Sequence, residues 1–266
     1  MRGRAMVDGF VATSFGRIHY VRSGHGEPLL LLHSNGNSVY EFEDVIPRLE
    51  DAYDTIAWDM PGQGDSDPAV RHLTIDDYAG CVVEVMDGLG IDDAFVAGTS
   101  IGGFVCASLA TRHAARMKAV ALIETMFRSE SEWAENWGMV EANFGLPTQS
   151  IEKVQARINR VTPEFLERWN IDRNKAGAWS MMSVMWAIRE YDIGSAARRI
   201  SIPALLMFGT KGPTIATMDQ FRAAVPQAEV AVLPDTGHFP MIDQPGDFVA
   251  ELRKFFSRSR SFDPSR

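Results

Sequence analysis

The sequence predicts an α/β fold, a mostly parallel, doubly wound sheet of about eight strands with a helical segment inserted between two of them. Short apolar runs bounded by turn residues alternate with helical patterns along most of the 266 residues. Such alternation specifies parallel strands with helices on both faces of the sheet. The rhythm stops once, between residues 126 and 198. We therefore expect a core domain built from residues 1–125 and 199–266, and a helical cap, or lid, over residues 126–198.

The N-terminal part supplies the first strands. Residues 11–22 alternate apolar and polar side chains around a Phe-Gly turn, which is typical of a β-hairpin at a sheet edge. Residues 28–33 contain a continuous leucine run, as expected for a strand that is buried on both faces. A polar loop and a helix to about residue 49 follow, and the next strand is expected at 55–59.

The central strands and helices are marked by the residues that bound them. Residues 60–66 read Met-Pro-Gly-Gln-Gly-Asp-Ser, a run of turn formers that is incompatible with a helix or a sheet interior. A helix is expected from about 75 to 89, with Thr74 as its N-cap. Two further buried strands end at about residue 99 and at residue 124, and a helix separates them.

The C-terminal part begins with the helical segment, which is rich in large apolar residues. It contains five of the six tryptophans of the chain, Trp133, Trp137, Trp169, Trp179 and Trp186. Strands are expected again at 202–209 and 229–233. A helix at about 217–224 separates them, and a last helix covers about 245–256.

Charge and cysteine content narrow the class of protein. The net charge of −9 argues against a basic face of the kind that binds nucleic acid or an anionic membrane. Cys81 and Cys106 lie in predicted helices without metal-ligand spacing, which predicts free buried thiols and a reducing compartment. No segment has the length of a membrane span or the apolar region of a signal peptide. These features predict a cytoplasmic protein, and an apolar cap is compatible with a homodimer.

The stretch that is most informative about function is Gly-Thr-Ser-Ile-Gly at 98–102. Gly-x-Ser-x-Gly between a strand and a helix is the pattern of a nucleophile elbow, a sharp turn that exposes a serine hydroxyl. Gly98 and Gly102 allow the close backbone approach that such a turn needs. Ser100 then lies at a helix N-terminus, where free N–H groups stabilise negative charge. Taken alone, the pentapeptide is also compatible with a glycine-rich turn whose serine has no role.

The order of these signals resembles the α/β-hydrolase family over nearly the whole chain. The resemblance rests on Leu-Leu-Leu-Leu-His at 29–33, Asp-Met-Pro-Gly-Gln-Gly-Asp-Ser at 59–66, the elbow, the helical cap, and Gly-His at 237–238 before the last helix. It implies the α/β-hydrolase fold, a Ser–acid–His triad, an oxyanion hole and a cap over the pocket. Two positions depart from the family pattern. Ser34 stands where the family commonly has glycine, and Gly212 stands where it commonly has its acid.

A serine nucleophile needs a base within hydrogen-bond reach, and the base needs an orienting acceptor. His238 is the expected base, because it lies in a Gly-His loop near the C-terminus, as the family order Ser…acid…His requires. Glu124 is the expected acid, because it closes the buried strand after the elbow helix and a carboxylate there needs a partner. Glu124 could instead be tied to a surface arginine. Asp235, Asp219 and Asp243 are then the competing acids.

Within the family, the chain resembles the zearalenone-type lactonases, which combine a serine nucleophile with an acid at this strand end. It shares with them the Asp-Met-Pro-Gly turn at 59–62, the placement of Glu124, the missing acid near Gly212, and the stretch at 233–240. This resemblance implies a Ser–Glu–His triad and leaves the substrate open.

Two further sets of residues complete the predicted site. The oxyanion hole is expected from two backbone N–H groups, that of Ile101 after the nucleophile and that of Ser34 or Asn35 in the loop after the leucine-rich strand.

Cap residues are expected to line the substrate pocket. Trp179 and Trp186 lie about two helical turns apart and are expected to share a helix face with Met182. Although tryptophan and methionine at helical spacing usually belong to a core, we expect these three to line an apolar pocket that faces the nucleophile.

Together these features predict a serine hydrolase that cleaves a carboxylic ester or lactone of a sizeable hydrophobic or aromatic compound, through an acyl-enzyme on Ser100. No metal or organic cofactor is expected, since the sequence has no HExxH, phosphate-loop or dinucleotide motif. The alternatives are carbon–carbon bond hydrolysis of a diketone-like substrate, and a ligand-binding receptor or regulatory module on a hydrolase frame. Epoxide hydrolase or dehalogenase chemistry would require an aspartate in place of Ser100.

Overall fold

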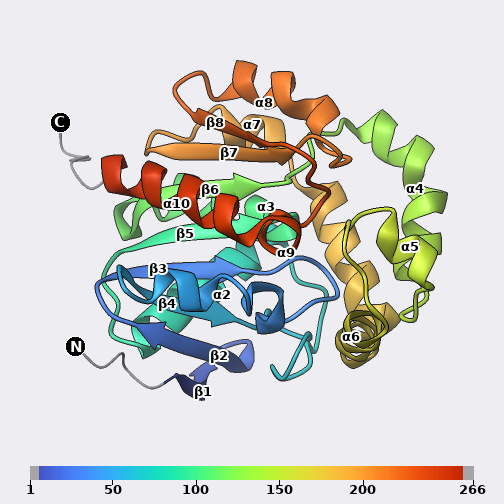
Figure 1. The fold of residues 1–266 in the computed structure, drawn as a ribbon, viewed down its shortest axis with the longest axis horizontal. Helices are drawn as coiled ribbons and strands as arrows, with labels where there is room; N and C mark the ends of the chain where they lie inside the picture. Colours follow the sequence, from blue (N-terminus) through green and yellow to red (C-terminus); the bar gives the residue numbers. More distant parts are fainter. Residues whose placement is uncertain (1–5, 260–266) are drawn as a thin grey trace.

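The computed structural model describes residues 6–259, which form one eight-stranded sheet with helices on both faces (Figure 1). The strands lie in the order β1-β2-β4-β3-β5-β6-β7-β8. β2 pairs antiparallel with β1 and with β4, whereas the other neighbours are parallel. The strand bounds are β1 Val7–Thr13, β2 Gly16–Gly24, β3 Glu27–Leu32, β4 Tyr53–Trp58, β5 Ala94–Thr99, β6 Met117–Ile123, β7 Ala204–Gly209 and β8 Glu229–Leu233. The predicted fold class is confirmed.

Each face of the sheet has its own apolar core, because successive side chains of a strand point to opposite faces. Leu30 of β3 belongs to the core that contains side chains of α2 (Ile75–Gly88) and α3 (Ile101–Arg112). Its neighbour Leu31 belongs to the second core, which contains side chains of α10 (Pro245–Ser259). A strand that serves two cores must be apolar at every position, which explains the uninterrupted leucine run of β3.

Proline accounts for two differences from the sequence prediction. The helix expected up to residue 49 consists of two short pieces, η1 (Val39–Phe42) and α1 (Ile46–Leu49). Pro47 stands in the first turn of α1, which is where a residue without an N–H is tolerated. The strand expected from residue 202 begins only after Pro203, which cannot donate to a sheet ladder. The remaining short helices of the core are η2 Ala114–Arg116, η3 Ile215–Thr217, α8 Met218–Ala224 and α9 Pro240–Asp243.

The predicted N-cap of α2 is confirmed. The Asp77 N–H donates to Thr74 Oγ1 at 3.1 Å, and the Thr74 N–H donates to the Asp77 carboxylate at 2.9 Å. This reciprocal capping box satisfies two N–H groups at the helix start.

Between β6 and β7 the chain is helical, with α4 (Glu130–Phe144), α5 (Ile151–Gln155), α6 (Pro163–Glu190) and α7 (Ile193–Ala197). Figure 1 shows α4, α5 and α6 grouped beside one end of the sheet. α7 instead contacts α3 and α8 of the core. α6 bends at Gly177, whose φ of 71° is accessible to glycine at little cost. The cap boundaries 126 and 198 remain a prediction.

Within residues 6–259, no helix combines the length and apolarity that a membrane span requires.

Close backbone packing at the end of β5 gives a first prediction. A Cβ on Gly98 would overlap the backbone carbonyl of Gly102 in α3. Gly98→Ala should therefore destabilise the fold by about 3 kcal/mol or more, because neither backbone segment can move aside. Thermal unfolding followed by circular dichroism measures the loss.

Gly138→Ala is the matched control. Gly138 is exposed in the middle of α4, and a Cβ there meets nothing within 4 Å. Better helix propensity should stabilise this variant by about 0.5–1 kcal/mol. A Gly98→Ala variant as stable as wild type would contradict the tight packing of the elbow.

Candidate active site

Ser100 lies in the sharp turn between β5 and α3, with φ 56° and ψ −112°. A serine in this region is strained, and such strain persists where packing enforces it. Gly102 and Gly103 permit the turn, since a Cβ on either would overlap Leu32 or Thr125. Within the described residues, the Ser100 hydroxyl makes no hydrogen bond, so it is available to a reacting group.

Glu124 follows β6 directly and is fully buried, with φ 47°. Its Oε1 accepts from the Gly209 N–H at 2.6 Å, and its Oε2 accepts from the Thr214 hydroxyl at 2.7 Å. Oε2 also lies 3.1 Å from Nδ1 of His238, which is 6% exposed. A proton on Nδ1 leaves Nε2 of the imidazole as a lone-pair acceptor, which is the tautomer that a base for Ser100 needs.

Gly212 explains why the acid follows β6 and not β7. A Cβ at this position would overlap both carboxylate oxygens of Glu124. The carboxylate of Glu124 thus occupies the space that a side chain at 212 would need. An acid at position 212 and a carboxylate of Glu124 in its present place would exclude each other sterically, so the chain has only one of them.

The competing carboxylates are engaged elsewhere. Asp243 accepts from the N–H groups of Gly237 and Asn159, both at 2.8 Å, and so fixes the loop that carries the histidine. Asp235 has an exposed side chain that pairs with Lys211 at 3.4 Å. Asp219, also exposed, lies 3.9 Å from Arg222. Within the described residues, none of the three carboxylates contacts His238.

The oxyanion loop after β3 corrects one expectation. The Ser34 N–H donates to Glu41 Oε2 at 3.0 Å, and the Ser34 hydroxyl donates to the same oxygen at 2.7 Å. Ser34 therefore cannot offer its N–H to a substrate without breaking this bond. The N–H groups of Asn35 and Ile101 donate to no acceptor in the described part of the chain, which leaves them as the candidate oxyanion donors.

Two polar residues that the sequence reading missed hold this loop. Glu41 is 6% exposed, and its Oε2 also accepts from Asn37 Nδ2 at 2.8 Å. Gln63 is buried, accepts from the Gly36 N–H at 2.7 Å and donates to Asn35 Oδ1 at 2.8 Å. The sequence showed Gln63 only as part of a turn, and nothing local identified its long-range partners.

The cap reaches the oxyanion loop through the second half of α6. Asn35 Nδ2 donates to the Met181 carbonyl at 2.9 Å. The sulfur of Met181 also lies 2.9 Å from where a Cβ on Gly36 would be. α6 thus covers the carboxyl end of β3 and encloses the site from that side.

The three predicted pocket residues lie together but away from the triad. Trp179, Met182 and Trp186 line a hollow of about 590 Å³, and Ser100, Glu124 and His238 do not. Trp179 is 59% exposed, and Trp186 is 41% exposed with its ring 4.4 Å from that of Trp137. The expectation that they face the nucleophile is wrong, because Trp179 and Trp186 are exposed and Met182, which is half-buried, packs against the core on the α2 and α3 side of the sheet.

Three side chains near the 59–66 turn have the spacing of metal ligands, but hydrogen bonds within the protein account for their arrangement. Ligand atoms of His19, Asp59 and Asp65 lie within 4.8 Å of one another. Asp59 Oδ2 already lies 2.7 Å from His19 Nδ1 and accepts from the Asp65 N–H at 2.8 Å, while its Oδ1 accepts from the Val39 N–H at 2.7 Å. Burial lowers the pKa of His19, but the bonds to Asp59 and Asp8 outweigh it and leave the pKa raised. We interpret the group as an ion pair that fixes the 59–66 turn.

Comparisons with known proteins agree with this fold. A sequence model of the family described as alpha/beta hydrolase fold matches residues 27–149. The enol-lactonase from Burkholderia xenovorans superposes with a TM-score of 0.80 at 24% identity, covering 94% of this chain and 100% of that one. Residues 27–149 match the α/β-hydrolase family, and the chain has the α/β-hydrolase fold. At this identity the structural likeness shows the fold alone.

Relatives within the α/β-hydrolase family differ in their reactions. Haloalkane dehalogenase 2 of Mycobacterium tuberculosis is 27% identical, covering 92% of this chain and 93% of that protein. The 3-oxoadipate enol-lactonase 2 of Acinetobacter baylyi is 25% identical, covering 87% and 90%. The acetyltransferase component of an acetoin cleaving system from Cupriavidus necator is 28% identical, and the match spans 90% of this chain but 66% of that protein. These relatives support a hydrolase of this fold, and the zearalenone-type branch remains a prediction.

Moving the acid tests the steric relation between Glu124 and Gly212. Glu124→Ala should lower kcat for a p-nitrophenyl ester by about 10³- to 10⁴-fold, as expected for a triad that loses its acid. Gly212→Asp alone should be inactive or unfolded, because two carboxylates would overlap. The double variant Glu124→Ala/Gly212→Asp should recover at least about tenfold over Glu124→Ala, because the new carboxylate fills the vacated space.

Two controls accompany this series. Glu124→Ala/Gly212→Asn supplies the volume without the charge and should not recover activity. Asp235→Asn should retain the wild-type rate. Wild-type turnover in Glu124→Ala, or its loss in Asp235→Asn, would show that the acid has been assigned wrongly.

Proposed function

We propose that this protein is a serine hydrolase that cleaves a carboxylic ester or lactone through an acyl-enzyme on Ser100. The observation that carries the proposal is the buried hydrogen bond between Glu124 and His238 Nδ1, at the strand end where the Ser100 N–H donates to the Ile123 carbonyl at 2.8 Å. An imidazole oriented by a buried carboxylate and a serine held in a strained elbow are two of the parts that acyl transfer requires, so they support catalysis over ligand binding alone.

In the proposed reaction each of these groups has one role. His238 Nε2 accepts the hydroxyl proton as Ser100 Oγ attacks the carbonyl carbon. The carbonyl oxygen becomes an oxyanion and accepts hydrogen bonds from the Asn35 and Ile101 N–H groups. The imidazolium, stabilised by Glu124, returns the proton to the leaving alcohol oxygen. A water molecule then gives a proton to His238 and attacks the acyl-enzyme, which releases the acid and restores Ser100.

The nucleophile distinguishes this reaction from halide displacement and from epoxide opening. Displacement of a halide or opening of an epoxide on this frame uses a carboxylate nucleophile that forms an ester for water to cleave. Ser100 would form an ether instead, which water does not hydrolyse. The presence of enol-lactonases among the relatives supports acyl chemistry.

The substrate class remains a hydrophobic or aromatic ester or lactone. It must reach a site whose donors lie deep, since Asn35 is 6% exposed and Ile101 is fully buried. Carbon–carbon bond hydrolysis of a diketone-like substrate uses the same groups and is separated by identifying the products. We retain cytoplasmic location and a homodimer as predictions.

Turnover of a panel of p-nitrophenyl esters and lactones tests the proposed reaction. Wild type should release p-nitrophenolate from the esters with an initial burst that titrates with enzyme, because acylation precedes deacylation. Ser100→Ala should lose about 10⁴-fold or more in kcat, since no other group can form the acyl-enzyme. Ser131→Ala, an exposed serine of α4, is the control and should match wild type. Equal turnover by Ser100→Ala and wild type, or no turnover by either, would refute an acyl-enzyme on Ser100.

A further inference from the structure

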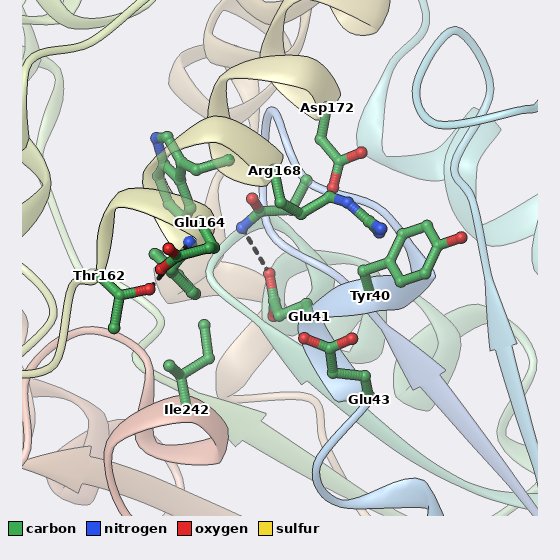
Figure 2. A pocket seen from close by; sticks show the side chains of 11 residues that line it. Tyr40, Glu41, Glu43, Thr162, Glu164, Arg168, Asp172 and Ile242 are labelled. Atoms are coloured by element: carbon green, nitrogen blue, oxygen red, sulfur yellow. Dashed lines mark hydrogen bonds between the residues drawn. The ribbon is translucent and has the colours of Figure 1, made fainter.

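A second hollow, of about 310 Å³, lies between η1 and the first half of α6, on the side of Glu41 (Figure 2). Ser100, Glu124 and His238 do not line it. Figure 2 shows Glu41 and Glu43 on one side, and Arg168 and Asp172 of α6 on the other. The lining residues are Asn37, Tyr40, Glu41, Glu43, Thr162, Glu164, Phe165, Arg168, Trp169, Asp172 and Ile242.

Glu41 is the side chain that indicates a ligand. It is 94% buried, and its Oε2 accepts from the Ser34 N–H, the Ser34 hydroxyl and Asn37. Its other oxygen, Oε1, is buried and has no hydrogen-bond partner in residues 6–259. A buried carboxylate oxygen without a donor is costly, and a donor supplied by a ligand would remove that cost.

The charge of the lining calls for a cation. The lining contains four carboxylates, those of Glu41, Glu43, Glu164 and Asp172, and one guanidinium, that of Arg168. Burial raises the pKa of Asp172, although hydrogen bonding by Ser38 and the charge of Arg168 oppose the shift. The lining therefore holds an excess of negative charge that is only partly neutralised within the protein.

Arg168 does not donate a hydrogen bond to Glu41 Oε1. Its guanidinium lies over the ring of Tyr40, with Cζ 3.6 Å from the ring centroid. Its NH1 atom is buried without a hydrogen-bond partner in the described residues. The guanidinium is thus held on an aromatic face, and Glu41 Oε1 receives no hydrogen bond from it.

The apolar residues in the lining favour an organic cation over a metal ion. Phe165, Trp169 and Ile242 contribute apolar surface, which an alkyl chain would cover. A hard divalent ion would instead require six or more oxygen ligands. A primary ammonium matches both features, because it donates up to three hydrogen bonds and carries a chain.

We propose that this hollow binds a small primary alkylammonium whose N–H donates to Glu41 Oε1, and that its occupancy is transmitted to the oxyanion loop. Glu41 holds Ser34, and Asn35, one residue on, is the candidate oxyanion donor. The buried charge of Glu41 opposes the negative charge that develops on the substrate oxygen. A bound ammonium offsets that charge, so hydrolysis becomes faster.

Calorimetric titration with butylammonium tests the site independently of the reaction. Butylammonium should bind about tenfold or more tightly than 1-butanol, its neutral analogue, because it forms a charge-assisted hydrogen bond to a buried oxygen. Butyrate should not bind. Glu41→Gln should weaken butylammonium binding by about 10- to 100-fold. Glu167→Gln, an exposed neighbour on α6 outside the lining, is the matched control and should bind like wild type.

Glu43→Gln is a second test in case Glu41→Gln fails to fold. Glu43 lies at the exposed rim, so its loss should weaken binding severalfold without disturbing the oxyanion loop. Equal affinity for butylammonium and 1-butanol, or unchanged affinity in both variants, would overturn the ammonium site.

The rate measurement rests on the proposed function and tests the coupling. Saturating butylammonium should raise kcat for a neutral p-nitrophenyl ester by about two- to tenfold in wild type, with little change in KM. A purely competitive effect, seen as a higher KM at constant kcat, would place the ammonium in the substrate site and overturn the separate site. Binding without any change in rate would refute the coupling to the oxyanion loop.

Discussion

The hydrogen bond between Glu124 and His238 is the interaction around which the site is built. A fully buried carboxylate is tolerable only when its oxygens are satisfied, and here the donors come from Gly209, Thr214 and His238. Each donor stands on a different segment, at the end of β7, before η3 and after β8. The geometry of this candidate site therefore depends on the strand order β6-β7-β8, and any change in that order would leave an unpaired buried charge.

Space left by glycine is the second constraint. Gly98, Gly102 and Gly103 let the elbow turn pass against neighbouring segments, and Gly212 leaves room for the carboxylate of Glu124. In each case the missing side chain belongs to one segment and the group that fills the space belongs to another. The chain departs from the usual acid position because a side chain that follows β6 fills the space that a glycine leaves in the loop after β7.

The loop after β3 carries the candidate oxyanion donor and is bonded both to α6 and to a residue that lines the second hollow. Asn35 is bound to the Met181 carbonyl of α6 and to Gln63, while Ser34 is bound to Glu41. A movement of α6 would therefore pull on the residue that carries the candidate oxyanion donor. This arrangement gives the cap and the hollow a physical connection to the chemistry.

Local patterns in the sequence determined the fold class, the elbow and the choice of Glu124 at a strand end, because strand alternation and glycine spacing are properties of neighbouring residues. The choice of His238 came from the order of motifs that the chain shares with the α/β-hydrolases. The tertiary structure decided what those patterns could not contain. It showed that the Ser34 N–H is occupied by Glu41, that Gln63 supports the oxyanion loop, and that Trp179 and Trp186 point outward. These outcomes depend on residues that are far apart in the sequence, such as Asn35 and Met181. A hydrogen bond across such a separation produces no periodic pattern that the sequence could reveal.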